Sequence, residues 1–172
     1  FRAYNNLGEM AFAAGDVAKA ESYFKQAAAK NANAPEVNAN LGLCELVKNN
    51  VASAETYLGK ATGANAANEA LGNLYIKQGQ YQRAVNAFGD AKTNSAAQAQ
   101  ILAKDYNKAK ATLQAVANKD AMTDYLMAIV GARTNNESLV KSSIKSAIAK
   151  DASLAEKAAN DREFAKFASA LK

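Results

Sequence analysis

The sequence contains no histidine and no tryptophan, and only one cysteine and one proline among its 172 residues. Without histidine, imidazole-based catalysis and metal binding are excluded, as are Ser-His and Cys-His nucleophile pairs. The single cysteine, Cys44, excludes an internal disulfide and a CxxC metal site. No paired-carboxylate pattern, phosphate-binding loop or Ser-Lys motif stands out. We therefore expect no enzyme activity, no cofactor and no bound metal.

Long hydrophobic runs are also missing, since the longest uncharged apolar stretches have only a few residues and a membrane span needs about 20. We therefore expect no direct membrane insertion. The formal net charge of +5 is modest, and basic and acidic residues are interleaved, as on solvated helix faces. The tyrosines do not alternate with basic residues on one surface, so no nucleic-acid partner is expected.

Alanine and asparagine are abundant: alanine supplies about a quarter of the chain and asparagine about a tenth. Both shares are well above those of an average protein. Because alanine is the best helix former, this bias predicts an all-helical protein with close contacts between helices.

A pattern of small and apolar residues recurs three times in the first half of the chain. In each copy a Leu-Gly pair is followed, 12 residues after the glycine, by an alanine, and four residues later by a large apolar residue. The three sets are Gly8, Ala20 and Phe24; Gly42, Ala54 and Leu58; and Gly72, Ala84 and Phe88. Turn-forming residues lie between the glycine and the alanine of each copy: Gly15-Asp16, Asn49-Asn50 and Gly79-Gln80. Such recurrence predicts a repeat protein.

This pattern resembles the tetratricopeptide repeat family, whose unit is a helix–turn–helix of 34 residues. The resemblance is specific over residues 1–94 and weaker afterwards, where turns are expected at Asp105-Tyr106 and Asn135-Asn136. It implies an all-α, right-handed superhelix of about five helical hairpins. The expected units are residues 1–34, 35–64, 65–94, 95–120 and 121–152, followed by a C-terminal capping helix at 153–172.

Two local features support this interpretation. Glycine inside a helix costs about 1 kcal/mol relative to alanine, so its recurrence at Gly8, Gly42 and Gly72 predicts helix pairs that approach closely there. Within 153–172, Asp161 is expected to cap a final amphipathic helix, whose apolar face would hold Phe164, Phe167, Ala168 and Leu171. The chain starts at Phe1 within a helical pattern, and we expect it to be a segment of a longer protein.

The resemblance implies that the first helix of each hairpin lines a concave groove. The candidate binding residues on this surface are Asn5, Asn6, Glu9, Asn40, Leu43, Asn73 and Lys77, and Phe12 is expected to face the same groove. Asparagine amides could hold the backbone of an extended peptide, or they could simply be solvated. A clamp for the C-terminal carboxylate of a chaperone is not expected, because only Asn40 fits that motif and Glu9 would repel a carboxylate.

The expected function is protein–protein interaction, as an adaptor or scaffold whose groove holds a peptide or a partner helix. One alternative is a structural spacer or self-associating segment of a larger bacterial cell-envelope protein, so a homo-oligomer stays open. Another is a regulatory segment of a protein whose catalytic part lies elsewhere. The most basic region could instead dock an acidic partner; it comprises Lys104, Lys108, Lys110, Lys141 and Lys145. Cys44 is expected to be a packed structural residue.

Overall fold

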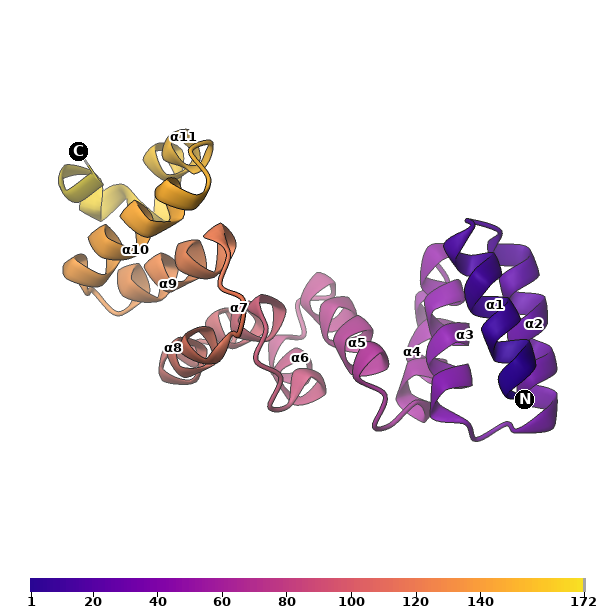
Figure 1. The fold of residues 1–172 in the computed structure, drawn as a ribbon. Helices are drawn as coiled ribbons and strands as arrows, with labels where there is room; N and C mark the ends of the chain where they lie inside the picture. Colours follow the sequence, from indigo (N-terminus) through magenta and orange to yellow (C-terminus); the bar gives the residue numbers. More distant parts are fainter. Residues whose placement is uncertain (172) are drawn as a thin grey trace. The chain divides into compact units, whose positions relative to one another are not determined.

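The computed structural model describes residues 1–171 and consists of helices joined by short turns (Figure 1). The predicted all-α fold is confirmed for this part of the chain, which contains eleven α-helices, one 3-10 helix and no strand. Five helix–turn–helix segments follow one another along the chain: α1 (Arg2–Ala13) and α2 (Val17–Lys30), α3 (Pro35–Val47) and α4 (Val51–Lys60), α5 (Asn65–Lys77) and α6 (Tyr81–Phe88), α7 (Asn94–Leu102) and α8 (Tyr106–Ala115), and α9 (Ala121–Arg133) and α10 (Glu137–Lys150).

The chain divides into two compact units, Phe1–Gln78 and Gly79–Lys172. In the first unit, α1 pairs with α2 and α3 with α4, and α2 packs on α3. Its core contains Phe24, Val37, Leu41 and Cys44, all buried. In the second unit, α7 pairs with α8 and α9 with α10.

Glycine permits close helix contact in the first two pairs, as predicted. A Cβ atom at Gly8 would overlap the ring of Phe24, and one at Gly42 would lie 2.6 Å from Cγ of Leu58. Ala20 and Ala54, which follow these glycines by 12 residues, are also buried. The structure shows that the large apolar residue four positions later is the one that covers each glycine.

In each of the five helix–turn–helix segments, the turn after the first helix contains a residue at positive φ. These residues are Gly15, Asn49, Gly79, Lys104 and Asn135. The next residue precedes the second helix, and Asp16, Asp105 and Asn136 each accept a hydrogen bond there from a backbone N–H of its first turn. The fourth turn therefore lies at Lys104-Asp105, one residue before the predicted position, because Tyr106 already belongs to α8.

Lys104 has a φ of 64°, a conformation that costs a side chain with a Cβ atom about 1–2 kcal/mol. We expect Lys104→Gly to stabilise the C-terminal unit by about 1 kcal/mol, since glycine adopts this conformation without strain. Thermal and urea unfolding followed by circular dichroism would measure the effect. Lys108→Gly is the matched control, because Lys108 is helical and exposed and should lose about 1 kcal/mol. A similar loss of unfolding free energy in both variants would contradict the proposed strain at Lys104.

The C-terminal segment differs from the single capping helix expected at residues 153–172. It consists of α11 (Leu154–Asn160) and a 3-10 helix, η1 (Arg162–Leu171), with a kink at Phe167, and residue 172 lies outside the described part. Asp161 lies between the two elements, where its carboxylate accepts hydrogen bonds from the backbone N–H of Glu163 and, at 2.6 Å, from the Tyr125 hydroxyl. This tie to α9 fixes the place where the chain leaves α11.

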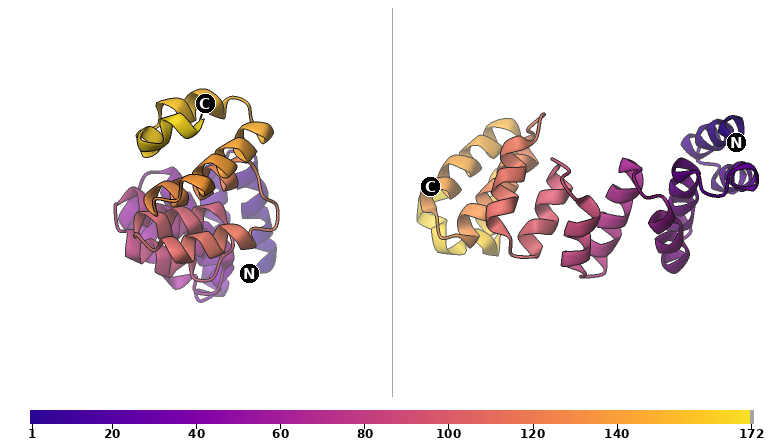
Figure 2. Two further views of the ribbon diagram at one scale, coloured as in Figure 1. Left: turned by 90° about the vertical axis from the view of Figure 1, so that its left-hand side faces the viewer. Right: turned by 90° about the horizontal axis from the view of Figure 1, so that it is seen from below.

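The same segment covers the last helix pair (Figure 2). Leu154, Ala158, Phe164 and Phe167 are buried in one cluster with residues of α9 and α10. Although its backbone differs from the prediction, its apolar residues do contribute to a packed core.

Candidate functional site

A pocket lies where α1 and α3 meet in the N-terminal unit. Its volume is about 180 Å³, and three helices contribute to its lining: Glu9, Phe12 and Ala13 from α1, Phe24 from α2, and Asn40 and Leu43 from α3. Phe24 is buried, Phe12 and Leu43 are half-buried, and Glu9 is exposed. The pocket therefore combines an apolar floor with a polar rim.

Three of the predicted binding residues form a hydrogen-bonded cluster at this rim. Asn5 Nδ2 donates to Glu9 Oε1 at 2.8 Å, and Asn40 Nδ2 lies 3.0 Å from Asn5 Oδ1 and 3.1 Å from Glu9 Oε1. Asn5 is only 5% exposed. Through its bond to Asn40, the Asn5 amide joins α1 to α3.

Leu43 lines the same pocket, but three other predicted residues are not brought together with this cluster. Asn6 is exposed on α1, Asn73 is half-buried on α5, and Lys77 is exposed in the last turn of α5. Among the described residues, none of the three lines the pocket or is hydrogen-bonded to Glu9 or Asn40.

Phe12 lines the pocket and was expected on this surface, whereas Ala13 and Phe24 were not. Phe12 and Ala13 follow Glu9 by three and four positions, a spacing that places side chains on one helix face. Phe24 is buried in the core of the first unit, and it also forms part of the pocket wall because Gly8 leaves room for its ring beside α1. Helical spacing could also have identified Ala13, whereas the place of Phe24 depends on the packing of α2 on α1.

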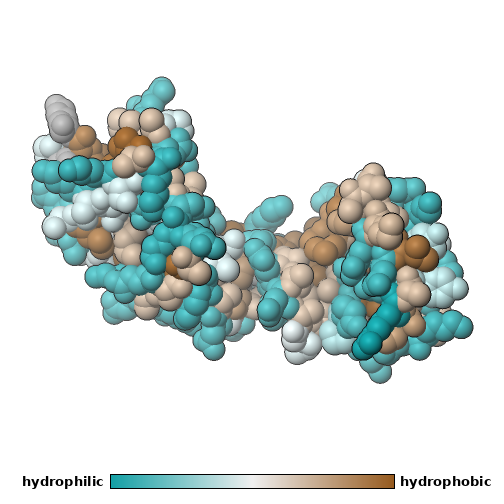
Figure 3. Space-filling view, in the orientation of Figure 1, coloured by the Kyte–Doolittle hydropathy of each residue, from teal (hydrophilic) through white to brown (hydrophobic). Residues whose placement is uncertain are grey.

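Brown hydrophobic surface is scattered among teal hydrophilic surface on the face drawn in Figure 3. The exposed large hydrophobic residues are Leu7, Met10, Val47 and Met122.

Among residues 1–171, no helix is both long enough and apolar enough to cross a membrane.

A second polar cluster joins α2 to α3. Lys48 Nζ lies 2.9 Å from Glu21 and 2.5 Å from Glu45, and Lys25 lies 2.7 Å from Glu21. The ammonium groups of Lys25 and then Lys48 lower the pKa of Glu21, and Lys48 and then the Asn50 amide lower that of Glu45. These charges are paired with one another, which fits a structural role between neighbouring hairpins.

Cys44 is fully buried, which agrees with the predicted structural role. Burial, with a smaller contribution from Glu21 and Glu45, raises the pKa of its thiol to about 11. The thiol is therefore protonated at neutral pH and is a poor nucleophile. No group of three or more metal-ligating side chains was found within residues 1–171.

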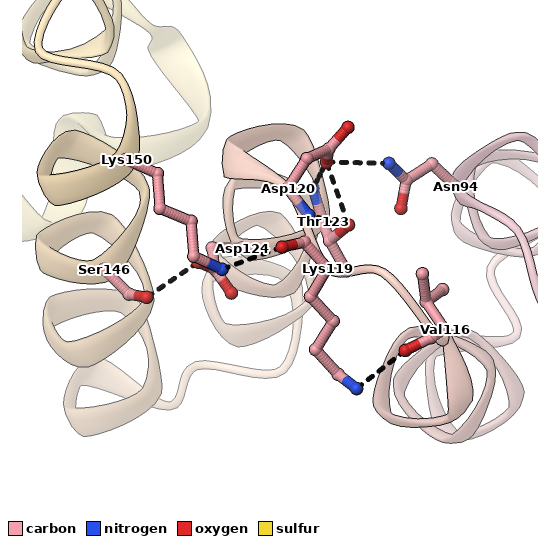
Figure 4. Close-up of polar contacts among 8 residues, drawn as sticks. All are labelled: Asn94, Val116, Lys119, Asp120, Thr123, Asp124, Ser146 and Lys150. Atoms are coloured by element: carbon pink, nitrogen blue, oxygen red, sulfur yellow. Dashed lines mark hydrogen bonds and ion pairs between the residues drawn. The ribbon is translucent and has the colours of Figure 1, made fainter.

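In the C-terminal unit, Asp120 stands at the start of α9 (Figure 4). Its carboxylate accepts hydrogen bonds from the backbone N–H and the hydroxyl of Thr123, at 2.8 and 2.9 Å, and from the Asn94 amide of α7 at 3.1 Å. These bonds lower the pKa of Asp120, with the Thr123 backbone as the largest cause. Helix capping and the tie to α7 account for this carboxylate.

The neighbouring charges also link helices (Figure 4). Asp124 of α9 accepts a hydrogen bond from Ser146 of α10 at 2.7 Å and pairs with Lys150 at 2.7 Å. Lys150 also donates to the backbone oxygen of Lys119. This network therefore holds α9 and α10 together. The residues of the predicted basic region are all exposed: Lys104, Lys108, Lys110, Lys141 and Lys145.

Comparisons with known proteins relate the chain to helical repeats. Two family models described as tetratricopeptide repeat match residues 11–74 and 67–109. A search of curated proteins finds no match.

Solved structures are similar in fold at low sequence identity. A tetratricopeptide repeat protein from Parabacteroides merdae ATCC 43184 has a TM-score of 0.75 and 19% identity, over 99% of this chain and 77% of that one. MamA, residues 41 to the end, from Desulfovibrio magneticus RS-1 has a TM-score of 0.70 and 15% identity, over 88% and 95% of the two chains. A thermophilic tetratricopeptide protein of Thermus thermophilus has a TM-score of 0.54 and 15% identity, over 99% and 98%.

Proposed function

The chain is a tetratricopeptide repeat protein of the αα-solenoid class, and on this premise we propose that it binds a peptide or a partner helix on the side where α1 and α3 meet. Proteins of this fold generally mediate protein–protein interactions and are typically non-enzymatic scaffolds. In this proposal the chain is an adaptor that carries out no reaction of its own.

The observation that carries the proposal is the pocket between α1 and α3. An apolar recess with a few fixed polar groups is the usual form of a binding site. The hydrogen bonds among Asn5, Glu9 and Asn40 hold its rim in one arrangement before binding. Less conformational freedom is then lost when a partner docks, which favours affinity.

In this proposal the predicted residues have different roles. Glu9, Asn40 and Leu43 contact the partner directly, and Asn5 positions Glu9. The partner extends beyond the pocket, and its flanking residues contact Asn6, Asn73 and Lys77.

Affinity capture from a lysate of the source organism, read by mass spectrometry, tests this function. We expect a partner that is retained by the wild-type chain and lost by the variant Asn40→Ala/Leu43→Asp, checked by circular dichroism to be folded. The matched control is Lys141→Ala/Lys145→Ala on the exposed face of α10, which should retain that partner. Loss only in the lysine variant would overturn the proposal in favour of the basic region, and equal capture by all three chains would also contradict it.

The alternative of a spacer or self-associating segment of a larger cell-envelope protein is favoured by one observation. Leu7 and Met10 on α1 are 42% and 70% exposed, whereas the equivalent Leu41 and Cys44 on α3 are buried under α2. An exposed apolar face of this kind can mark an association surface. Under this alternative, the molecular mass measured by sedimentation rises with protein concentration.

A further inference from the structure

The pocket between α1 and α3 has the size of a single large side chain. A cavity of about 150 Å³ lined by apolar residues can hold benzene, and this pocket measures about 180 Å³. Phe12, Phe24 and Leu43 supply apolar contacts, and Gly8 adds no side chain beside Phe24. A phenylalanine or leucine side chain of a partner therefore fits it by size and polarity.

The rim of this pocket carries a negative charge that no cation in its lining balances. Glu9 is the only charged residue of the lining. Both amides that contact it, from Asn5 and Asn40, are neutral and donate to the same oxygen, Oε1. A carboxylate has about four acceptor positions, so Oε2 keeps its capacity to accept further hydrogen bonds.

We propose that the pocket selects a segment in which an apolar anchor, phenylalanine or leucine, stands within two residues of a lysine or arginine. The anchor fills the pocket, and the cation pairs with Glu9 at the rim. This inference rests on the proposed function of the same surface and adds the chemistry of the partner. An acidic segment is disfavoured there because its charge would face the fixed carboxylate of Glu9.

A purely structural role for Glu9 makes a different prediction. If the carboxylate served only to join α1 to α3 through Asn40, its charge would have no effect on which partner binds. Glu9→Gln separates the two roles, because the amide has nearly the same shape and still offers an oxygen to Asn5 and Asn40.

The test uses an array of acetylated and amidated nine-residue peptides on a serine background. Each peptide carries Phe, Leu or Ala as the anchor, and Lys, Gln or Glu one or two positions away. With the wild-type chain we expect Phe and Leu peptides that carry Lys to bind about five- to tenfold more tightly than those with Gln, and Glu peptides to bind most weakly. This preference should shrink at high salt, because the pair is exposed.

In Glu9→Gln we expect the preference for Lys to disappear while the preference for Phe and Leu over Ala remains. Glu156→Gln on α11, outside the pocket, makes the same change in net charge and should behave as the wild type. Binding that depends on the anchor but not on the neighbouring charge would overturn this inference and leave the proposed function intact. If no peptide binds the wild-type chain, or Leu43→Asp binds them all as well as the wild type, the pocket is rejected together with that function.

Discussion

Replacing Phe164 by alanine is expected to destabilise the C-terminal unit by about 3–5 kcal/mol. The Phe164 side chain is 1% exposed and meets the Tyr125 ring edge-on, with 5.5 Å between the ring centroids. Its removal leaves a cavity between η1 and α9, which the surrounding helices can fill only in part. Urea unfolding followed by circular dichroism would measure the loss, and hydrogen exchange of α9 and α10 would locate it.

Lys166→Ala is the matched control for the apolar contribution of η1. Lys166 is exposed and donates a hydrogen bond to Asn135 at 2.6 Å. Because exposed polar contacts contribute little, we expect this variant to lose less than about 1 kcal/mol. A loss in Phe164→Ala no larger than in Lys166→Ala would show that η1 does not stabilise α9 and α10.

The second large effect is expected at Gly42, where leucine should cost about 1–3 kcal/mol through overpacking. A Cβ atom there would lie 2.6 Å from Cγ of Leu58 and 3.3 Å from its backbone nitrogen. Leu58 is buried, so its side chain has little room to move, and the backbone of α4 would have to shift. Thermal unfolding of the folded variant would show a lower midpoint.

Gly59→Leu is the matched control, because Gly59 does not lie at a contact between helices. It lies in α4, is exposed, and a Cβ atom there would meet nothing within 4 Å. Gly59→Leu should therefore gain about 0.5–1 kcal/mol from the higher helix propensity of leucine. Equal effects of leucine at the two positions would contradict the role of Gly42 in the contact between α3 and α4.

Most of the turns that follow a first helix could be located from the sequence alone. Gly15, Asn49, Gly79 and Asn135 have positive φ values at the predicted turns, and these residue types tolerate that conformation. Lys104 has a positive φ in the turn between α7 and α8. The sequence did not indicate a turn at this residue, because lysine has no preference for positive φ. Only the structure shows that the chain adopts this conformation at Lys104.

The candidate site was predictable in part. The repeat register placed Glu9, Asn40 and Leu43 on first helices, and all three line one pocket. The register did not show that Asn5 is buried, or that Phe24 of α2 reaches the same pocket. Burial and hydrogen-bond partners depend on how neighbouring helices pack, and one helix's periodicity does not contain that information.

By itself, the sequence determined the helical class, the repeat, and the close helix contacts at Gly8 and Gly42. These features are local, because they follow from helix propensity, spacing along one helix and the conformations that each residue type tolerates. Only the tertiary structure decided that the C-terminal segment forms two elements, α11 and η1, and which side chains form the pocket. In both cases the deciding contacts, Asp161 with Tyr125 and Asn40 with Glu9, join residues more than 30 positions apart. Such pairs form only when separate helices pack together, so a pattern within one repeat cannot specify them.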